Sequence, residues 1–161
     1  MNTGQSILTI GALALFSFII ISFGNLQSNY TSVSLLNESI VTGSGICQSM
    51  IDEISAKSFD EGTVSGAIAD SEGLTSPVSL GPDAGESSSA QYDDVDDYNN
   101  HTRTVSSERL GDFNVSVSVF YVNFDAPETE NASTSFVKKI NVIVTSDLIE
   151  GNIKQTSVMS Y

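Results

Sequence analysis

The feature that most constrains this chain is an uncharged, apolar segment near its N-terminus. No Asp, Glu, Lys or Arg occurs between Met1 and Asn37, and residues 7–23 read ILTIGALALFSFIIISF. At about 1.5 Å per residue in a helix, this run and its uncharged flanks are long enough to span a hydrocarbon layer of roughly 30 Å. We expect a helix here, because a helix satisfies the backbone hydrogen bonds within the segment.

Three interpretations of this segment compete. A secretory signal peptide begins with a basic stretch and ends at a small-residue cleavage site, whereas Met1 to Gly4 is uncharged and Ile21 to Gly24 is a poor cleavage site. Removal of the segment by signal-peptide cleavage near Gly24 is therefore disfavoured. The other two interpretations are a single-pass membrane anchor and a helix that starts in the membrane and later packs against copies of itself.

Charge and composition exclude several classes of function. The 161 residues include 6 Lys and Arg against 20 Asp and Glu, which gives a net charge of −14. Without a basic cluster the chain has little to neutralise phosphates, so nucleic acid is not expected as a partner. The only histidine is His101, which we expect at the surface, and the only cysteine is Cys47. We do not expect the protein to be an enzyme, because one histidine and one cysteine supply too few residues for a zinc centre or for a nucleophile with its base.

An amphipathic pattern follows the apolar run and predicts that the helix continues toward Phe59. Its apolar positions recur every three or four residues, as on one face of an α-helix: Leu36, Ile40, Gly43, Cys47, Met50 and Ile54. On this stripe Cys47 is expected to be a small buried residue. We therefore divide the helix into a membrane or assembly part, residues 5–28, and an amphipathic continuation, residues 29–59.

The C-terminal part of the sequence predicts a sheet. Residues 60–112 are rich in Gly, Pro and Ser and contain an acidic motif, and they indicate a loop region. Alternating apolar residues within 113–161 predict strands at about 113–121, 136–144 and 153–161, joined by turns that include Asp125-Ala126-Pro127. The expected fold class is α+β: a long helix packed on an antiparallel sheet of about three or four strands.

These features together resemble a type IV pilin-like subunit. Residues 46–61, ICQSMIDEISAKSFDE, resemble the end of the long helix in minor pilins of the mannose-sensitive haemagglutinin D type and in I-type pseudopilins of type II secretion. Two further blocks are similar to the D-type group, LGPDAGE at 80–86 and YDDVDDY at 92–98. The strand KKINVIV at 138–144 and a terminal strand ending at Tyr161 also fit this pattern.

The resemblance implies processing near the N-terminus. Residues 1–4 would be a leader cleaved after Gly4 by a prepilin peptidase, with Gln5 as the first mature, methylated residue. Thr9 then occupies the position where the family has a glutamate that offsets a neighbour's N-terminal charge. Either this subunit takes a tip or priming position without such a neighbour, or the leader stays and the protein is a pilin-derived anchor.

The acidic motif has two interpretations. Asp93, Asp94, Asp96 and Asp97, with Asn99, offer the hard oxygen ligands that Ca²⁺ prefers, although the spacing does not match an EF-hand loop. The alternative is a solvated, turn-rich surface in which aspartates cap nearby backbone amides. No cofactor is otherwise expected.

The sequence thus predicts a non-enzymatic minor pilin or pseudopilin of a type IV pilus or a type II secretion-like filament. Its expected partners are membrane lipid and other pilin-like subunits, whose helices could approach closely at the small residues Gly4, Gly11, Ala12 and Ala14. The expected location is the bacterial inner membrane, crossed once, with the C-terminal domain outside the cytoplasm. The alternative is an anchored extracytoplasmic binding domain that never assembles.

Overall fold

The computed structural model describes residues 2–161 and divides the chain into two units, one ending at Glu38 and the other covering Ser39–Tyr161. Helix α1 (Thr3–Ser55) contributes residues to both. The glycines and Asn25 do not interrupt it, and its first turn contains no acidic residue. In the first unit α1 is the only element that the described residues form.

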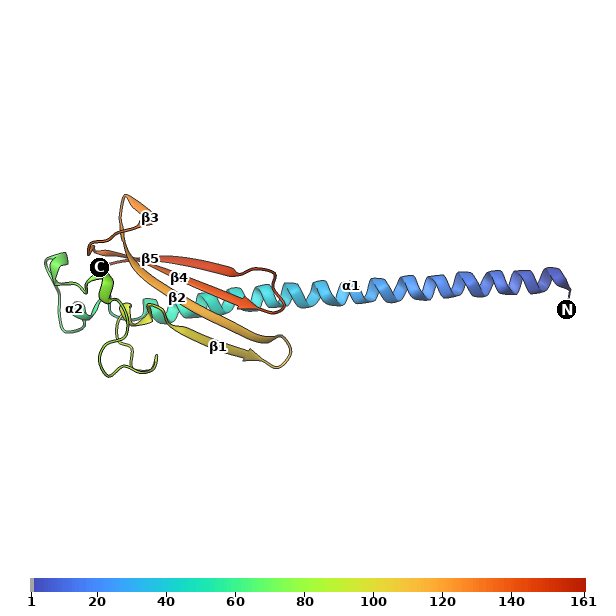
Figure 1. The fold of residues 1–161 in the computed structure, drawn as a ribbon, viewed down its shortest axis with the longest axis horizontal. Helices are drawn as coiled ribbons and strands as arrows, with labels where there is room; N and C mark the ends of the chain where they lie inside the picture. Colours follow the sequence, from blue (N-terminus) through green and yellow to red (C-terminus); the bar gives the residue numbers. More distant parts are fainter. Residues whose placement is uncertain (1) are drawn as a thin grey trace. The chain divides into compact units, whose positions relative to one another are not determined.

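The second unit contains an antiparallel sheet of five strands (Figure 1). The strands are β1 (Thr102–Ser107), β2 (Gly111–Asn123), β3 (Ala126–Glu130), β4 (Val137–Ser146) and β5 (Ile153–Ser160). Four of them follow the order β1-β2-β4-β5, and β3 pairs with the end of β2. The register places Val117 opposite Val142 and Ile140 opposite Ser157. The α+β class and the antiparallel sheet are confirmed.

The structure contains two strands that the sequence pattern did not reveal. β1 carries the sequence TRTVSS, whose alternation is too polar to stand out, and it forms because β2 offers it a paired edge from Thr102 to Ser107. β3 includes Pro127 and begins within the stretch that we expected to be a turn. It pairs with β2 only near Val122 and Asn123, where the register shifts, and a proline is tolerated at such an edge.

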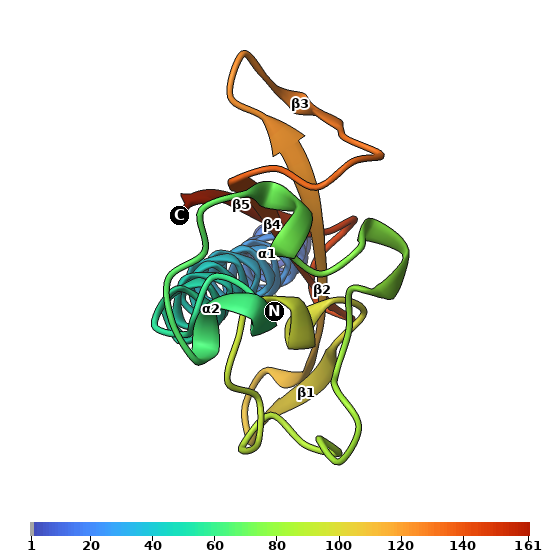
Figure 2. The ribbon, with the colours of Figure 1, turned by 90° about the vertical axis from the view of Figure 1, so that its left-hand side faces the viewer.

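The core of the second unit lies between the sheet and residues 39–55 of α1. The predicted inward face of β2 is buried, as are the facing positions of β4: Phe113, Val115, Val117, Val119, Tyr121, Ile140, Val142 and Val144. From α1 the buried residues are Ser39, Gly43, Cys47, Met50, Ile51 and Ile54. Figures 1 and 2 show this part of the helix against one face of the sheet. The predicted amphipathic stripe is thus confirmed from Gly43 onward, including the burial of Cys47.

Between α1 and β1 the chain forms short helical turns. These are α2 (Glu61–Val64) and the 3-10 helices Ser71–Gly73, Pro77–Ser79 and Asp96–Tyr98, of which the last is called η3 below. Figure 2 shows them around the end of the sheet where α1 finishes. A second apolar cluster of Phe59, Leu74 and Tyr121 lies beneath them.

Gly43 lies where α1 packs tightly against the sheet. A Cβ atom at this position would lie 2.6 Å from Cδ1 of Ile153 and 3.6 Å from Cγ1 of Val144, whereas one at Gly45 would meet nothing within 4 Å. We therefore expect Gly43→Leu to overpack the core and lower the free energy of unfolding by about 1–3 kcal/mol. Chemical denaturation of the purified full chain measures this difference.

Gly45→Leu is the matched control. It gains the same helix propensity, roughly 1 kcal/mol over glycine, without a steric conflict, so it should stabilise the domain. Equal effects of the two substitutions would contradict the packing described here.

Candidate functional site

Two parts of the chain are candidate functional sites, and the first is the apolar half of α1. Its most apolar stretch has no buried residue in the described structure, and it is the one described helix long and apolar enough to cross a membrane. Large side chains are exposed on every side of the helix, among them Leu8 at 74% and Phe18 at 70%. Because water does not favour such a surface, these residues require a lipid or protein environment.

Small residues lie on the same exposed surface. Gly4, Gly11, Ala12 and Ala14 are all exposed, and a Cβ atom added at Gly4 or Gly11 would meet nothing within 4 Å. These positions leave room for the backbone of a neighbouring helix to approach.

The Thr9 hydroxyl is bonded within its own helix. It donates toward the carbonyl oxygens of Gln5 and Ser6, at 3.0 and 2.9 Å. This back-bonding satisfies the hydroxyl in an apolar environment, but it supplies no negative charge for a neighbour. The predicted processing position, between Gly4 and Gln5, lies in the first turn of α1, and Met1 of the predicted leader is outside the described residues.

The second candidate site is the acidic motif, which is attached to the end of α1. The backbone amide of Ser58 donates to the carbonyl of Asp93 at 3.1 Å, and the amide of Val95 donates to the carbonyl of Ser58 at 3.0 Å. Asp94, Asp96 and Asp97 are buried, whereas Asp93 is exposed. The motif is therefore an ordered part of the fold.

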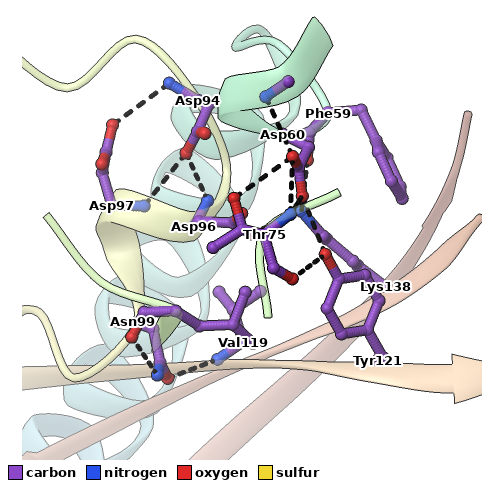
Figure 3. A network of polar contacts seen from close by, with 12 residues as sticks. Phe59, Asp60, Thr75, Asp94, Asp96, Asp97, Asn99, Val119, Tyr121 and Lys138 are labelled. Atoms are coloured by element: carbon purple, nitrogen blue, oxygen red, sulfur yellow. Dashed lines mark hydrogen bonds and ion pairs between the residues drawn. The ribbon is translucent and has the colours of Figure 1, made fainter. Parts of the chain in front are cut away.

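Two of its carboxylates hold the turn together. Oδ1 of Asp94 accepts from the amides of Asp96 and Asp97, at 2.6 and 3.2 Å, and Oδ2 of Asp97 accepts from those of Asp93 and Asp94, at 3.0 and 3.2 Å (Figure 3). The aspartates thus cap local amides, as the second interpretation of the motif anticipated. That interpretation was wrong about the solvated surface, because Asp94, Asp96 and Asp97 are buried. Burial and the nearby charge of Asp97 raise the pKa of Asp94 to about 7.

Asp96 points away from this turn toward a fully buried lysine. Nζ of Lys138, on β4, lies 2.5 Å from Oδ1 of Asp96, 2.7 Å from Oδ2 of Asp60 and 2.8 Å from the carbonyl oxygen of Phe59 (Figure 3). Lys138 and Asp60 have no exposed surface. A Lys ammonium has three donors, so all of them have acceptors here.

The two carboxylates that share Lys138 have opposite pKa shifts. Burial opposes ionisation of Asp60, but Lys138, Tyr121 and the Gly62 amide outweigh it and lower its pKa to about 2. For Asp96 burial dominates, and with the charges of Asp94 and Asp60 it raises the pKa to about 8. The difference follows from the number of donors, because several groups donate to Asp60 while Asp96 has Lys138 alone among the described side chains.

The structure brings together only part of the predicted calcium set. Carboxylate oxygens of Glu61, Asp93 and Asp94 lie within 4.8 Å of one another, as do those of Glu86, Asp93 and Asp97. Asp96 belongs to neither group. Asn99 has both polar ends engaged elsewhere, since it donates to the carbonyl of Leu80 and accepts from the amide of Val119, each at 3.0 Å.

Sequence reasoning missed Asp60, Lys138, Glu61 and Glu86. For Lys138 a signal existed, because it occupies an inward position in the alternation of β4, where a lysine is buried only with partners. The other three lie between α1 and β1, and their contacts with the motif depend on the fold.

His101 does not lie on the surface as expected. It is half-buried, and its ring lies edge-on to Tyr92 and Tyr98, with centroids 5.6 and 5.7 Å away. Burial lowers the pKa of His101 and raises that of the Cys47 thiol. His101 therefore contributes to aromatic packing around the acidic motif.

Comparison with known proteins yielded no relative. No protein-family profile matches the sequence, and the searches of curated proteins and of solved structures gave no match.

The pH dependence of stability tests the Asp60 cluster. With a folded pKa of about 2 and an ordinary value of 3.8, the Asp60 carboxylate stabilises the fold fully above pH 3.8, and this contribution is lost as the pH falls through 2. For the chain in which Lys138 carries its positive charge, we expect Asp60→Asn to lower the free energy of unfolding at pH 7 by about 2–3 kcal/mol. Urea titrations between pH 2 and 7 should show the difference shrinking toward the acid end.

Glu128→Gln is the control for this experiment. Glu128 also pairs with a lysine, Lys139, at 2.9 Å, but its side chain is 88% exposed. Removing such a surface pair should leave stability unchanged. A deficit of Asp60→Asn that persisted undiminished at pH 2 would contradict the assignment.

Calcium binding was one of two interpretations of the acidic motif and is untested, and Asp93 allows a direct test because both carboxylate groups share it. We expect Ca²⁺ to raise the melting temperature of the full chain and Asp93→Asn to abolish that rise. The control is Asp70→Asn, at an exposed acid outside both groups. Absence of calcium-dependent heat in calorimetry would discard the site.

Proposed function

We propose that this protein is a structural subunit of a membrane-derived filament of the type IV pilin-like class, either a minor pilin or a pseudopilin. The observation that carries the proposal is the exposure of apolar side chains all around the first half of α1. The second unit, in contrast, has a core of its own. Such a helix suits lipid before assembly and neighbouring apolar helices afterwards.

The small residues of α1 support close helix packing. Gly11, Ala12 and Ala14 lie in the exposed apolar stretch, and interfaces between membrane helices favour small residues because backbones can approach there. The other subunits of the filament would supply the facing helices.

Thr9 limits the position that the subunit takes in a filament. Its hydroxyl is bonded within the helix and carries no charge, so it offers nothing to the N-terminal ammonium of a neighbour. An unpaired charge in an apolar bundle is costly. The proposal therefore places the subunit where no such neighbour follows, at a tip or in a priming complex.

The proposed location rests on the apolar helix and on the acidic charge of the chain. We propose that α1 crosses the bacterial inner membrane once and that the acidic sheet domain lies outside the cytoplasm. Its net negative charge would favour solubility there. A domain of the same structure that stays anchored and binds a partner without assembling is the alternative that the tests must separate.

Processing is tested on protein isolated from its own membranes. We expect intact mass and N-terminal sequencing to show a chain that begins at Gln5 and carries an N-methyl group. Gly4→Asp should block this processing and leave Met1 in place. A wild-type chain that keeps Met1 would favour the anchored domain. A chain that starts near Asn25 would contradict both the filament subunit and the anchored domain.

Assembly is tested by crosslinking in membranes. We expect the full-length protein to crosslink into a ladder with other pilin-like subunits, and Gly11→Leu to weaken that ladder because it blocks close helix approach. Leu15→Ile, which keeps the apolar volume, should leave the ladder intact. A wild-type protein that crosslinks only as a monomer would favour the non-assembling domain.

A further inference from the structure

The environment of Lys138 differs from that of a salt bridge at the protein surface. Its amine is completely buried and contacts two carboxylates at once, Asp96 at 2.5 Å and Asp60 at 2.7 Å. The side chain of Asp96 is 3% exposed. Desolvating an ion pair costs several kcal/mol per ion, and here one cation faces two acids.

The surroundings of the amine are aromatic. Nζ of Lys138 lies 4.5 Å from the ring centroid of Phe59 and 5.0 Å from that of Tyr121. In so dry an environment, transfer of a proton from the ammonium of Lys138 to the carboxylate of Asp96 removes two buried charges. The products are a neutral amine, which is a nucleophile, and a neutral carboxylic acid, which is an electrophile.

One oxygen of Asp96 is not held by any hydrogen bond among the described residues. Its Oδ1 accepts from Lys138, but its Oδ2 is buried and has no hydrogen-bond partner among the described residues. An unpaired buried oxygen costs about 1–3 kcal/mol. Asp60 is different, because both of its oxygens accept from other groups, including the Thr75 amide and the Tyr121 hydroxyl.

We propose that Lys138 and Asp96 join in an intramolecular amide bond. Nζ of Lys138 attacks Cγ of Asp96, the N–C bond forms, the Cγ–Oδ2 bond breaks and the oxygen leaves as water. After the initial proton transfer the amine holds two protons and the acid one. One stays on the amide nitrogen and two leave with the water, so no oxidant or other reactant is needed.

Asp60 acts as the base in this step, because neutralising Lys138 removes the largest influence that lowers the pKa of Asp60. Its Oδ2 lies 2.7 Å from the reacting nitrogen, within reach of the proton that the nitrogen must lose after attack. Asp60 then returns the proton to the departing oxygen and is regenerated as a carboxylate. In the product it accepts a hydrogen bond from the amide N–H.

The bond would connect the acidic motif to the sheet. It joins η3 to β4 across 42 positions of the sequence, at the end of the domain where the 61–98 segments lie. A covalent link of this kind restricts the unfolded chain and resists extension. The inference does not depend on the proposed filament role.

Intact mass under denaturing conditions tests the proposal on the purified full chain. We expect a mass lower than that of the sequence, after allowance for N-terminal processing, by one water molecule. Trypsin digestion should yield peptide 58–103 joined to peptide 110–139, because the modified Lys138 resists cleavage. Fragment ions of the joined peptides should place the bond at Asp96.

Matched variants complete the test. Lys138→Met and Asp96→Ala should each have the full mass of their sequence, whereas Lys139→Met, at the neighbouring lysine paired with Glu128, should keep the deficit. Since the mass and the peptide map of the wild-type chain decide the question, a variant that fails to fold does not weaken the experiment. A wild-type chain of full mass, or a bond mapped to Asp60, would overturn the proposal.

Discussion

The contact of the Lys138 amine with Asp60 and Asp96 is the interaction on which the end of the sheet domain depends. It joins three segments that are distant in sequence: the turn after α1, the acidic motif and β4. The first two of these segments also bury apolar side chains, among them Phe59 and Tyr98. Lys138 fixes their positions because its nitrogen contacts the Phe59 carbonyl, Asp60 and Asp96 in a site with no exposed surface.

Asp60 extends this constraint to the rest of the loop. It caps α2 through the Gly62 amide, and it accepts from both the amide and the hydroxyl of Thr75. At Gly62 an added Cβ atom would lie 2.6 Å from the carbonyl oxygen of Gly73, so the chain is closely packed around the carboxylate. The order of the Gly- and Ser-rich segment thus derives from these polar contacts together with the apolar cluster of Phe59, Leu74 and Tyr121.

The two units differ in whether their apolar side chains are buried or exposed. Residues 39–161 bury their apolar surface and their charged network internally, whereas the apolar side chains of residues 7–26 remain exposed on all sides. The second unit is therefore stabilised by a core of its own, whereas the first offers apolar surface for contact with lipid or with other helices. This division is the physical reason for preferring an assembly or anchoring role.

The sequence by itself determined the elements that rest on a single periodicity. Spacing of three or four predicted the amphipathic part of α1 and its buried stripe, and alternation predicted β2, β4 and β5, because one face of each meets solvent and the other the core. The first part of α1 was predicted from its uncharged apolar run instead. Only the tertiary structure decided β1 and β3, which form because β2 offers them a partner. It also divided the acidic motif between local caps and Lys138, since which carboxylate meets a cation on a distant strand depends on chain folding and not on spacing along the sequence.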